Sequence, residues 1–214
     1  MSLRHSCLLF FRCLEKKPIF SAVFDDFCKH TINSQRMKGI VFTEFFEMVE
    51  EEFGYEMVDT LVETTVLPSG GIYTAVGTYD YNEIISLVAN LSQRTQIPVP
   101  ALLRAYGKYL FKSFTRIYNR FLQSPSDAFT FLGSIHDYIH VEVQKLYPDA
   151  ELPHFDIERV DDNTLIMNYY SKRKMADFAH GLIEGTLLHF SENATITQQA
   201  IKEDGSHVQF VIVK

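Results

Sequence analysis

Cysteine is scarce in this chain of 214 residues, and its three cysteines, Cys7, Cys13 and Cys28, all lie near the N-terminus. The rest of the chain has no thiol, which excludes a disulfide framework and a cysteine-ligated metal there. Long hydrophobic runs are also missing, because the apolar N-terminal stretch is interrupted by Arg12 and followed by Glu15. Such a stretch is too short to span a bilayer and makes a poor secretory signal. We therefore expect a cytoplasmic protein that does not insert into a membrane.

Basic residues are outnumbered by acidic ones, 20 against 27. The imbalance lies after residue 36, where 14 basic side chains face 24 acidic ones, whereas the first 36 residues carry six basic and three acidic groups. So acidic a surface repels phosphate backbones, which argues against a nucleic-acid partner. A cleaner amphipathic pattern begins at Met37. We interpret residues 1–36 as an N-terminal extension of doubtful status and residues 37–214 as the functional domain.

The hydrophobic pattern changes character at Pro153. Before it, apolar residues recur at helical spacing, and the predicted helices are 38–53, 55–66, 80–95, 99–122 and 124–148. After it, short β-branched segments alternate with polar turns, and the predicted strands are 154–160, 164–171, 193–202 and 207–213, with one helix at 175–190. The predicted fold class is α+β, in which a helical N-terminal subdomain packs on a C-terminal antiparallel sheet with helices.

The run HDYIH, residues 136–140, places two histidines on one face of a predicted helix. It resembles the zinc-protease signature HExxH, but Asp137 is shorter than glutamate and no third ligand follows at a familiar spacing. At about 100° per residue, His136 lies nearer the centre of the apolar stripe and His140 nearer its edge. Periodicity therefore favours His136 as the inward histidine. A zinc-dependent hydrolase and a cofactor-free interaction domain both stay open as alternatives.

A second candidate site is the run YYSKR, residues 169–173, at the end of a predicted strand. Because alternate side chains of an extended segment project to one side, Tyr169, Ser171 and Arg173 would form a row. A phenol, a hydroxyl and a guanidinium together suit carboxylates or phosphates, and Arg173 can bind such groups through two hydrogen bonds. The same pattern also arises where a strand simply ends at the protein surface.

Together with MKGIVFTEFFEMVEEEFG at 37–54, HVEVQKLYP at 140–148 and YYSKRKMADFAHGLIEG at 169–185, these motifs resemble the H-NOX family. This family comprises haem nitric oxide/oxygen binding domains, found alone in bacteria and as the sensor part of soluble guanylate cyclase. The resemblance covers residues 37–214. It implies that haem b (iron protoporphyrin IX) is buried between the two parts of the fold, with His140 as the axial iron ligand in place of His136.

The resemblance also implies roles for the residues around the haem. Tyr169, Ser171 and Arg173 would hold the two propionates, which as carboxylates in an apolar pocket need a cation and several donors. Pro153 would press on the porphyrin and distort it.

On the opposite, distal face of the haem, oxygen-binding members of the family carry a tyrosine, a tryptophan and an asparagine. The corresponding positions here hold Phe178, Phe45 and Leu110, and Val41 is assigned to the same pocket. Oxygen on haem iron needs a hydrogen-bond donor to stay bound, whereas nitric oxide does not. The resemblance therefore implies a sensor selective for nitric oxide over oxygen, which would also bind carbon monoxide.

Such a sensor is not an enzyme, and it would signal in trans after the bond between iron and His140 weakens. The resemblance suggests a histidine kinase or a cyclic-di-GMP enzyme as the protein partner. Some members also carry a cysteine-rich zinc site near the C-terminus, a pattern from which this chain departs because no cysteine follows Cys28.

Overall fold

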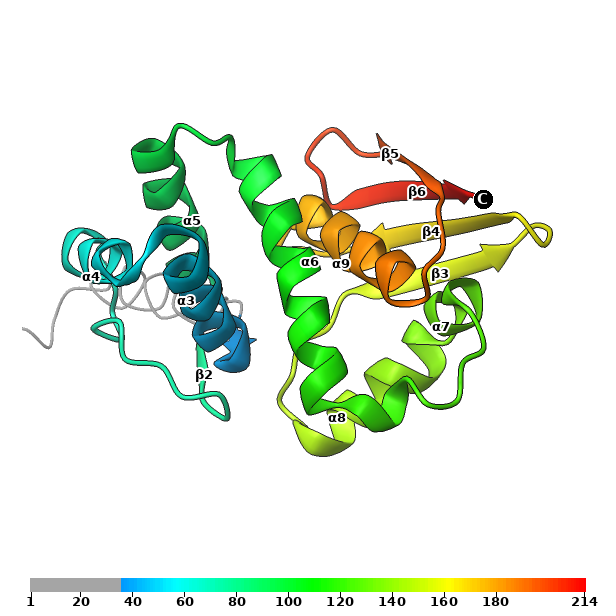
Figure 1. Cartoon of the computed structure of the whole chain (residues 1–214), viewed down its shortest axis with the longest axis horizontal. Coiled ribbons are helices and arrows are strands. Elements are labelled where there is room, and N and C mark those ends of the chain that lie inside the picture. The colour runs from blue at the N-terminus through cyan, green and yellow to red at the C-terminus, as the bar shows by residue number, and fades with distance from the viewer. Residues whose placement is uncertain (1–35) are drawn as a thin grey trace, which may run out of the picture. The chain divides into compact units, whose positions relative to one another are not determined.

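Helices dominate the N-terminal half of the computed structural model, which describes residues 36–214 (Figure 1). The helices of this half are α3 (Ile40–Phe53), α4 (Tyr55–Thr64), α5 (Tyr81–Thr95) and α6 (Val99–Ile117). A small antiparallel ribbon pairs β1 (Arg36–Lys38) with β2 (Thr78–Asp80). The four predicted helices are confirmed, but α6 ends at Ile117 and not at residue 122. The ribbon was not predicted, and α3 begins after Lys38 because that residue belongs to β1. The interpretation of residues 1–36 as an extension concerns residues outside the described range, except for Arg36.

Local sequence signals explain where these helices begin and end. Gly54 follows α3 with a φ of 85°, a conformation that glycine adopts without strain. Asp80 caps α5 as predicted, because its carboxylate accepts a hydrogen bond from the Asn82 backbone N–H at 2.8 Å. The apolar faces of the helices meet in a shared core, in which Phe42 and Leu87 are completely buried. This core gives α3 a fixed position beside the ribbon.

The predicted helix 124–148 is divided into three segments, and the prediction of one continuous helix was wrong. The three segments are α7 (Ala128–Gly133), a π-helical turn, η2 (Ile135–Ile139), and α8 (His140–Leu146). A 3₁₀ turn, η1 (Asn119–Phe121), precedes them and lies within the range predicted for the helix 99–122. The carbonyl of Ser134 accepts hydrogen bonds from both Tyr138 N at 2.9 Å and Ile139 N at 3.1 Å. The second bond spans five residues, which is the π-helical pattern. Helical phase calculated at about 100° per residue therefore does not carry through this segment.

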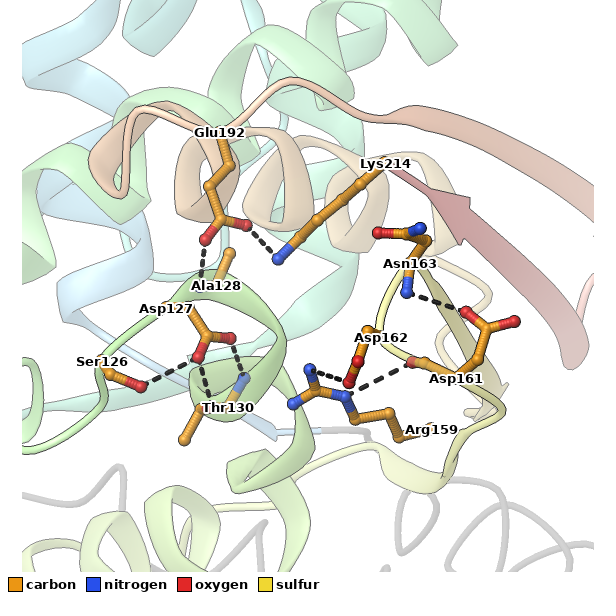
Figure 2. Close-up of polar contacts among 10 residues, drawn as sticks. All are labelled: Ser126, Asp127, Ala128, Thr130, Arg159, Asp161, Asp162, Asn163, Glu192 and Lys214. Carbon is orange, nitrogen blue, oxygen red and sulfur yellow. Dashed lines mark hydrogen bonds and ion pairs between the residues drawn. The ribbon is translucent and has the colours of Figure 1, made fainter.

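The start of α7 is anchored by a polar network (Figure 2). The Asp127 carboxylate accepts hydrogen bonds from Thr130 N at 2.9 Å and from the Thr130 hydroxyl at 2.8 Å. These bonds lower the pKa of Asp127 to about 2. The Glu192 carboxylate accepts a hydrogen bond from Ala128 N and lies 2.6 Å from Lys214 Nζ. The network thus connects Lys214, at the C-terminal end of the chain, with the segment that leads into η2 and α8.

The C-terminal part is an antiparallel sheet with α9 (Ala176–His189) packed on one face (Figure 1). The strands lie in the order β3, β4, β6, β5, and their bounds are His154–Arg159, Thr164–Tyr170, His207–Val213 and Thr195–Ala200 respectively. Along β4, Leu165, Met167 and Tyr169 are buried while the residues between them are half-buried. This alternation gives the sheet one face toward α9. The predicted α+β class and the predicted strands are confirmed.

Helices α6 and α9 pack closely, and this contact joins the helical part to the sheet part. A Cβ atom added to Gly107 of α6 would overlap the carbonyl oxygen of Phe178, and one added to Gly181 of α9 would overlap the carbonyl oxygen of Arg104. Glycine at both positions therefore lets the two backbones touch. Glu184 of α9 also forms ion pairs with Arg104 and with Lys108, the latter at 3.2 Å. Within residues 36–214, no helix combines the length and apolar character needed to cross a membrane.

Candidate functional site

A cavity of about 280 Å³ lies where the helical part meets the sheet part. Its walls come from β1, the start of α3, the C-terminal half of α6, the segment from α7 to α8, the loop 147–153, β4 and α9. The walls are mainly aliphatic and aromatic side chains, with polar groups gathered at a few positions. A cavity of this kind suits a largely apolar ligand that is oriented by a few polar contacts.

His140, the first residue of α8, lines the cavity, whereas His136 does not. The imidazole of His140 packs against the Phe155 ring at 5.9 Å, and no hydrogen bond to it is found among residues 36–214. Burial, together with the nearby His136 and His154, lowers the pKa of His140 from 6.5 to about 4. The ring is therefore neutral at physiological pH, which is the form that coordinates a metal.

His136 points to a different environment from that of His140. Its ring lies 4.3 Å from the His154 ring, and its Nδ1 atom is buried without a hydrogen-bond partner in the described part of the chain. The rings of His136 and His140 are 6.4 Å apart, and no cluster of three or more histidine, cysteine or acidic residues suited to a metal occurs within residues 36–214. The periodicity argument for His136 was wrong about which histidine faces the cavity, because the π-helical turn η2, which contains His136 and ends just before His140, changes the helical phase. A shared zinc ion in this helix finds no support in this arrangement.

Tyr169, Ser171 and Arg173 all line the cavity, but a turn brings them together, not a continuous strand. β4 ends at Tyr170, so the strand alternation predicted through Arg173 was wrong. The Ser171 hydroxyl accepts a hydrogen bond from Arg173 N at 3.1 Å, which shapes the turn. The Tyr169 hydroxyl accepts a hydrogen bond from Met175 N at 3.1 Å, which fixes the phenol at the start of α9.

The Arg173 side chain already engages acceptors at the edge of the cavity. Its Nη2 donates to the Arg36 carbonyl at 3.0 Å and to the Glu151 carbonyl, and it lies 3.3 Å from the Glu151 carboxylate. The side chain is only 13% exposed. A guanidinium held in this way is placed to bind carboxylates, such as the propionates of a haem.

Three of the four residues assigned to the distal pocket, Val41, Leu110 and Phe178, line the cavity. Phe45 is completely buried but is not part of the lining, and its ring packs against the Tyr106 ring at 5.3 Å. Pro153, assigned to haem distortion, does line it.

Tyr106, which sequence reasoning did not single out, contacts both Phe45 and the cavity-lining Phe178. Its ring is 5.2 Å from that of Phe178, and its hydroxyl donates a hydrogen bond to the Val41 carbonyl. That hydroxyl is therefore already engaged. The only sequence signal for Tyr106 was its place four residues before Leu110 on one face of the predicted helix.

A second polar group at the cavity edge was also missed. Lys38, Thr78 and Asp149 line the cavity and contact one another, although they lie far apart in the sequence. Nearby, the hydroxyls of Tyr118 and Tyr147 lie 2.9 Å apart. No local pattern marks these residues, because each contact joins distant segments.

The donor set fits a haem. An iron porphyrin needs an apolar cavity, an axial ligand for the iron and polar partners for two carboxylates. The cavity supplies a neutral, unpaired imidazole at His140 and a cluster of donors at Tyr169, Ser171 and Arg173. The residues present are therefore suited to this group.

Comparison with known proteins agrees with this assessment. The family model described as Haem-NO-binding (HNOB) matches residues 38–198, so the chain belongs to the H-NOX family of haem-binding gas-sensor domains. The domain is a sensor and not an enzyme.

Solved H-NOX structures share the fold. The unliganded Fe(II) H-NOX protein from K. algicida is 44% identical, with a TM-score of 0.80, over 83% of this chain and 96% of that chain. The H-NOX protein from S. oneidensis in the Fe(II)NO ligation state is 29% identical, with a TM-score of 0.77, over 82% of this chain and 98% of that chain. The IWP-051-bound H-NOX from Shewanella woodyi, in the Fe(II)CO ligation state, is 44% identical, with a TM-score of 0.72, over 83% of this chain and 94% of that chain.

A curated relative is the soluble guanylate cyclase gcy-35 of Caenorhabditis elegans. It is 25% identical over 141 residues, which cover 64% of this chain. The matched region spans only 20% of that cyclase.

Proposed function

We propose that this chain is a nitric oxide sensor that discriminates against oxygen, with haem b as its cofactor. The observation that carries the proposal is the character of the cavity wall formed by Val41, Leu110 and Phe178. None of these side chains has a hydrogen-bond donor, and the neighbouring Tyr106 hydroxyl is held by the Val41 carbonyl. Oxygen on haem iron needs a donor to stay bound, whereas nitric oxide does not. Polarity alone would thus separate the two gases.

The roles of the other residues follow from their positions in the cavity. His140 would coordinate the iron, and Tyr169, Ser171 and Arg173 would hold the propionates. Bound haem supplies an iron atom with a coordination position open to nitric oxide or carbon monoxide. Pro153, which lines the cavity next to β3, would press on the flat ring. The apolar side chains around these groups exclude water and so strengthen each polar contact.

The output of the sensor is a change in the position of α8. His140 begins this helix, so weakening of its bond to iron would release a constraint on α8. A protein partner can respond only if the two states of the sensor present different surfaces. We propose that the partner is a histidine kinase or a cyclic-di-GMP enzyme, acted on in trans. A partner with a basic docking surface would suit the excess of acidic over basic residues in this chain.

The ultraviolet-visible spectrum of the purified full chain tests the proposal. We expect a strong Soret band in the ferrous protein that shifts when nitric oxide is added and stays unchanged in air. A colourless protein that also fails to take up added haem would contradict the haem assignment. A Soret band that shifts in air as it does with nitric oxide would contradict the selectivity but not the haem site.

A further inference from the structure

A cluster of polar side chains fastens the loop after α8 to the β1–β2 ribbon. Lys38 Nζ of β1 donates hydrogen bonds to the Asp149 carboxylate at 2.8 and 3.1 Å and to the Thr78 hydroxyl of β2 at 2.8 Å. The Thr78 hydroxyl in turn donates to Asp149 Oδ2 at 2.8 Å. The three residues therefore form a closed ring of contacts between segments that are distant in the sequence.

The Lys38 end of the cluster is shielded from solvent, whereas the Asp149 side chain is 58% exposed. The Lys38 side chain is only 13% exposed, and its ammonium group lies 5.2 Å from the centre of the Tyr147 ring. A largely buried ammonium group needs these acceptors, because water cannot replace all of them. Removing one partner would leave the Lys38 charge incompletely paired.

On one side, the cluster is directly connected to α8. Asp149 lies three residues beyond Leu146, where α8 ends. A backbone hydrogen bond from Ala150 N to Tyr147 O at 2.9 Å makes the intervening chain a tight turn. A displacement of α8 would therefore reach Asp149 without being absorbed by a long flexible loop.

On the other side, the cluster is directly connected to the helical part. β1 leads into α3 within two residues, and Ile40 N, at the start of α3, donates a hydrogen bond to Ala75 O at 3.0 Å. β2 ends at Asp80, whose side chain caps α5. A movement of the ribbon would therefore displace the N-terminal ends of both α3 and α5.

We propose that Lys38, Thr78 and Asp149 form a latch that passes movement of α8 to the starts of α3 and α5. This inference rests on the proposed function, since it assigns the path by which release of His140 reaches the helical part. Coupling of this kind requires an element whose two states are biased from both ends, and the latch would fill this role by being closed in one state of the sensor and broken in the other.

Hydrogen–deuterium exchange on the haem-loaded ferrous full chain, with and without nitric oxide, tests the latch. In the natural sequence we expect nitric oxide to change exchange in α8 and at the starts of α3 and α5. In Asp149→Asn and in Lys38→Met the change in α8 should persist, while the change in α3 and α5 should fall about fivefold or more. The double variant should lose no more than either single variant, because both break one contact. Thr78→Val removes the hydroxyl that β2 contributes to the same contact, and it tests the latch without changing any charge.

Asp204→Asn is the matched control. Asp204 is about as exposed as Asp149 and pairs with Lys174 at 3.4 Å, so this variant also removes one carboxylate from an ion pair, but within the C-terminal part. It should leave the response of α3 and α5 intact.

An unchanged response in all three latch variants would overturn the inference, as would a natural protein in which α8 responds and the starts of α3 and α5 do not. Failure of the proposed function is distinguishable, since it would appear earlier as a chain without a Soret band or without a spectral response to nitric oxide.

Discussion

Replacing Phe178 with tyrosine tests whether the lack of a hydrogen-bond donor excludes oxygen. Phe178 lines the cavity beside Val41 and Leu110, which offer no side-chain acceptor for a new hydroxyl. The hydroxyl of Tyr106, whose ring lies 5.2 Å from that of Phe178, is already bonded to the Val41 carbonyl. The added hydroxyl would therefore be available to a gas molecule in the cavity.

The expected gain follows from the free energy of one hydrogen bond. Such a bond contributes about 0.5–1.5 kcal/mol between neutral groups and about 1.5–3 kcal/mol when one partner carries charge. Oxygen on haem iron acquires partial negative charge, so we take the boundary value of about 1.5 kcal/mol, which corresponds to a rise in oxygen affinity of about tenfold. The affinity for nitric oxide should change little. The gas-free variant should also be less stable, because a buried donor without a partner costs about 1–3 kcal/mol.

Equilibrium oxygen titration of the ferrous protein, followed by the Soret band, measures the effect, and thermal unfolding measures the cost. Phe46→Tyr is the matched control, because Phe46 packs in the core of the helical part and does not line the cavity. It should leave oxygen affinity unchanged. If Phe178→Tyr keeps its haem and its oxygen affinity stays within about twofold of the parent, the donor explanation of selectivity is refuted.

Three further tests concern the candidate iron ligand, the contact between α6 and α9, and the cap of α7. His140→Gly should lose haem, or keep it only with added imidazole, whereas His136→Ala should keep the parent spectrum; the opposite result would make His136 the ligand. Gly107→Ala should destabilise the protein by about 1–3 kcal/mol in urea unfolding, because its Cβ overlaps a carbonyl oxygen of α9, whereas Gly133→Ala, with nothing within 4 Å, should not. Asp127→Ala should cost about 0.5–2 kcal/mol near pH 7 by removing the α7 cap. Since the pKa of Asp127 is lowered from 3.8 to about 2, its contribution is present above about pH 4 and should vanish as the pH falls through 2. A pH-independent difference would contradict this.

The elements that could be predicted are those whose signal is local. The spacing of apolar residues in α3 to α6 and the β-branched alternation in β4 and β6 are properties of short windows, and both matched the structure. The ribbon of β1 and β2 was missed because three-residue strands have no period of their own. Its pairing joins Met37 to Tyr79, which are distant in the sequence.

The candidate site was predicted in its residue types but not in its geometry. Tyr169, Ser171 and Arg173 are neighbours in the chain, so they were expected to act together, yet a turn and not a strand unites them. Phe45 was expected in the cavity wall, but it packs against Tyr106 and does not line the cavity. Which layer a buried aromatic ring occupies depends on the packing of α3 against α6, and no local pattern reports this.

By itself, the sequence determined the α+β class, the absence of cysteine chemistry after Cys28 and the presence of two candidate histidines on one segment. Periodicity favoured His136 and the family resemblance assigned His140, and the tertiary structure shows that His140 is the histidine that lines the cavity. The π-helical turn η2 shifts the backbone hydrogen bonds by one residue, so His140 enters the cavity and His136 packs against His154. Only the tertiary structure decided the contact of Lys38 with Asp149, since a hydrogen bond between segments 111 residues apart exists only once the chain has folded.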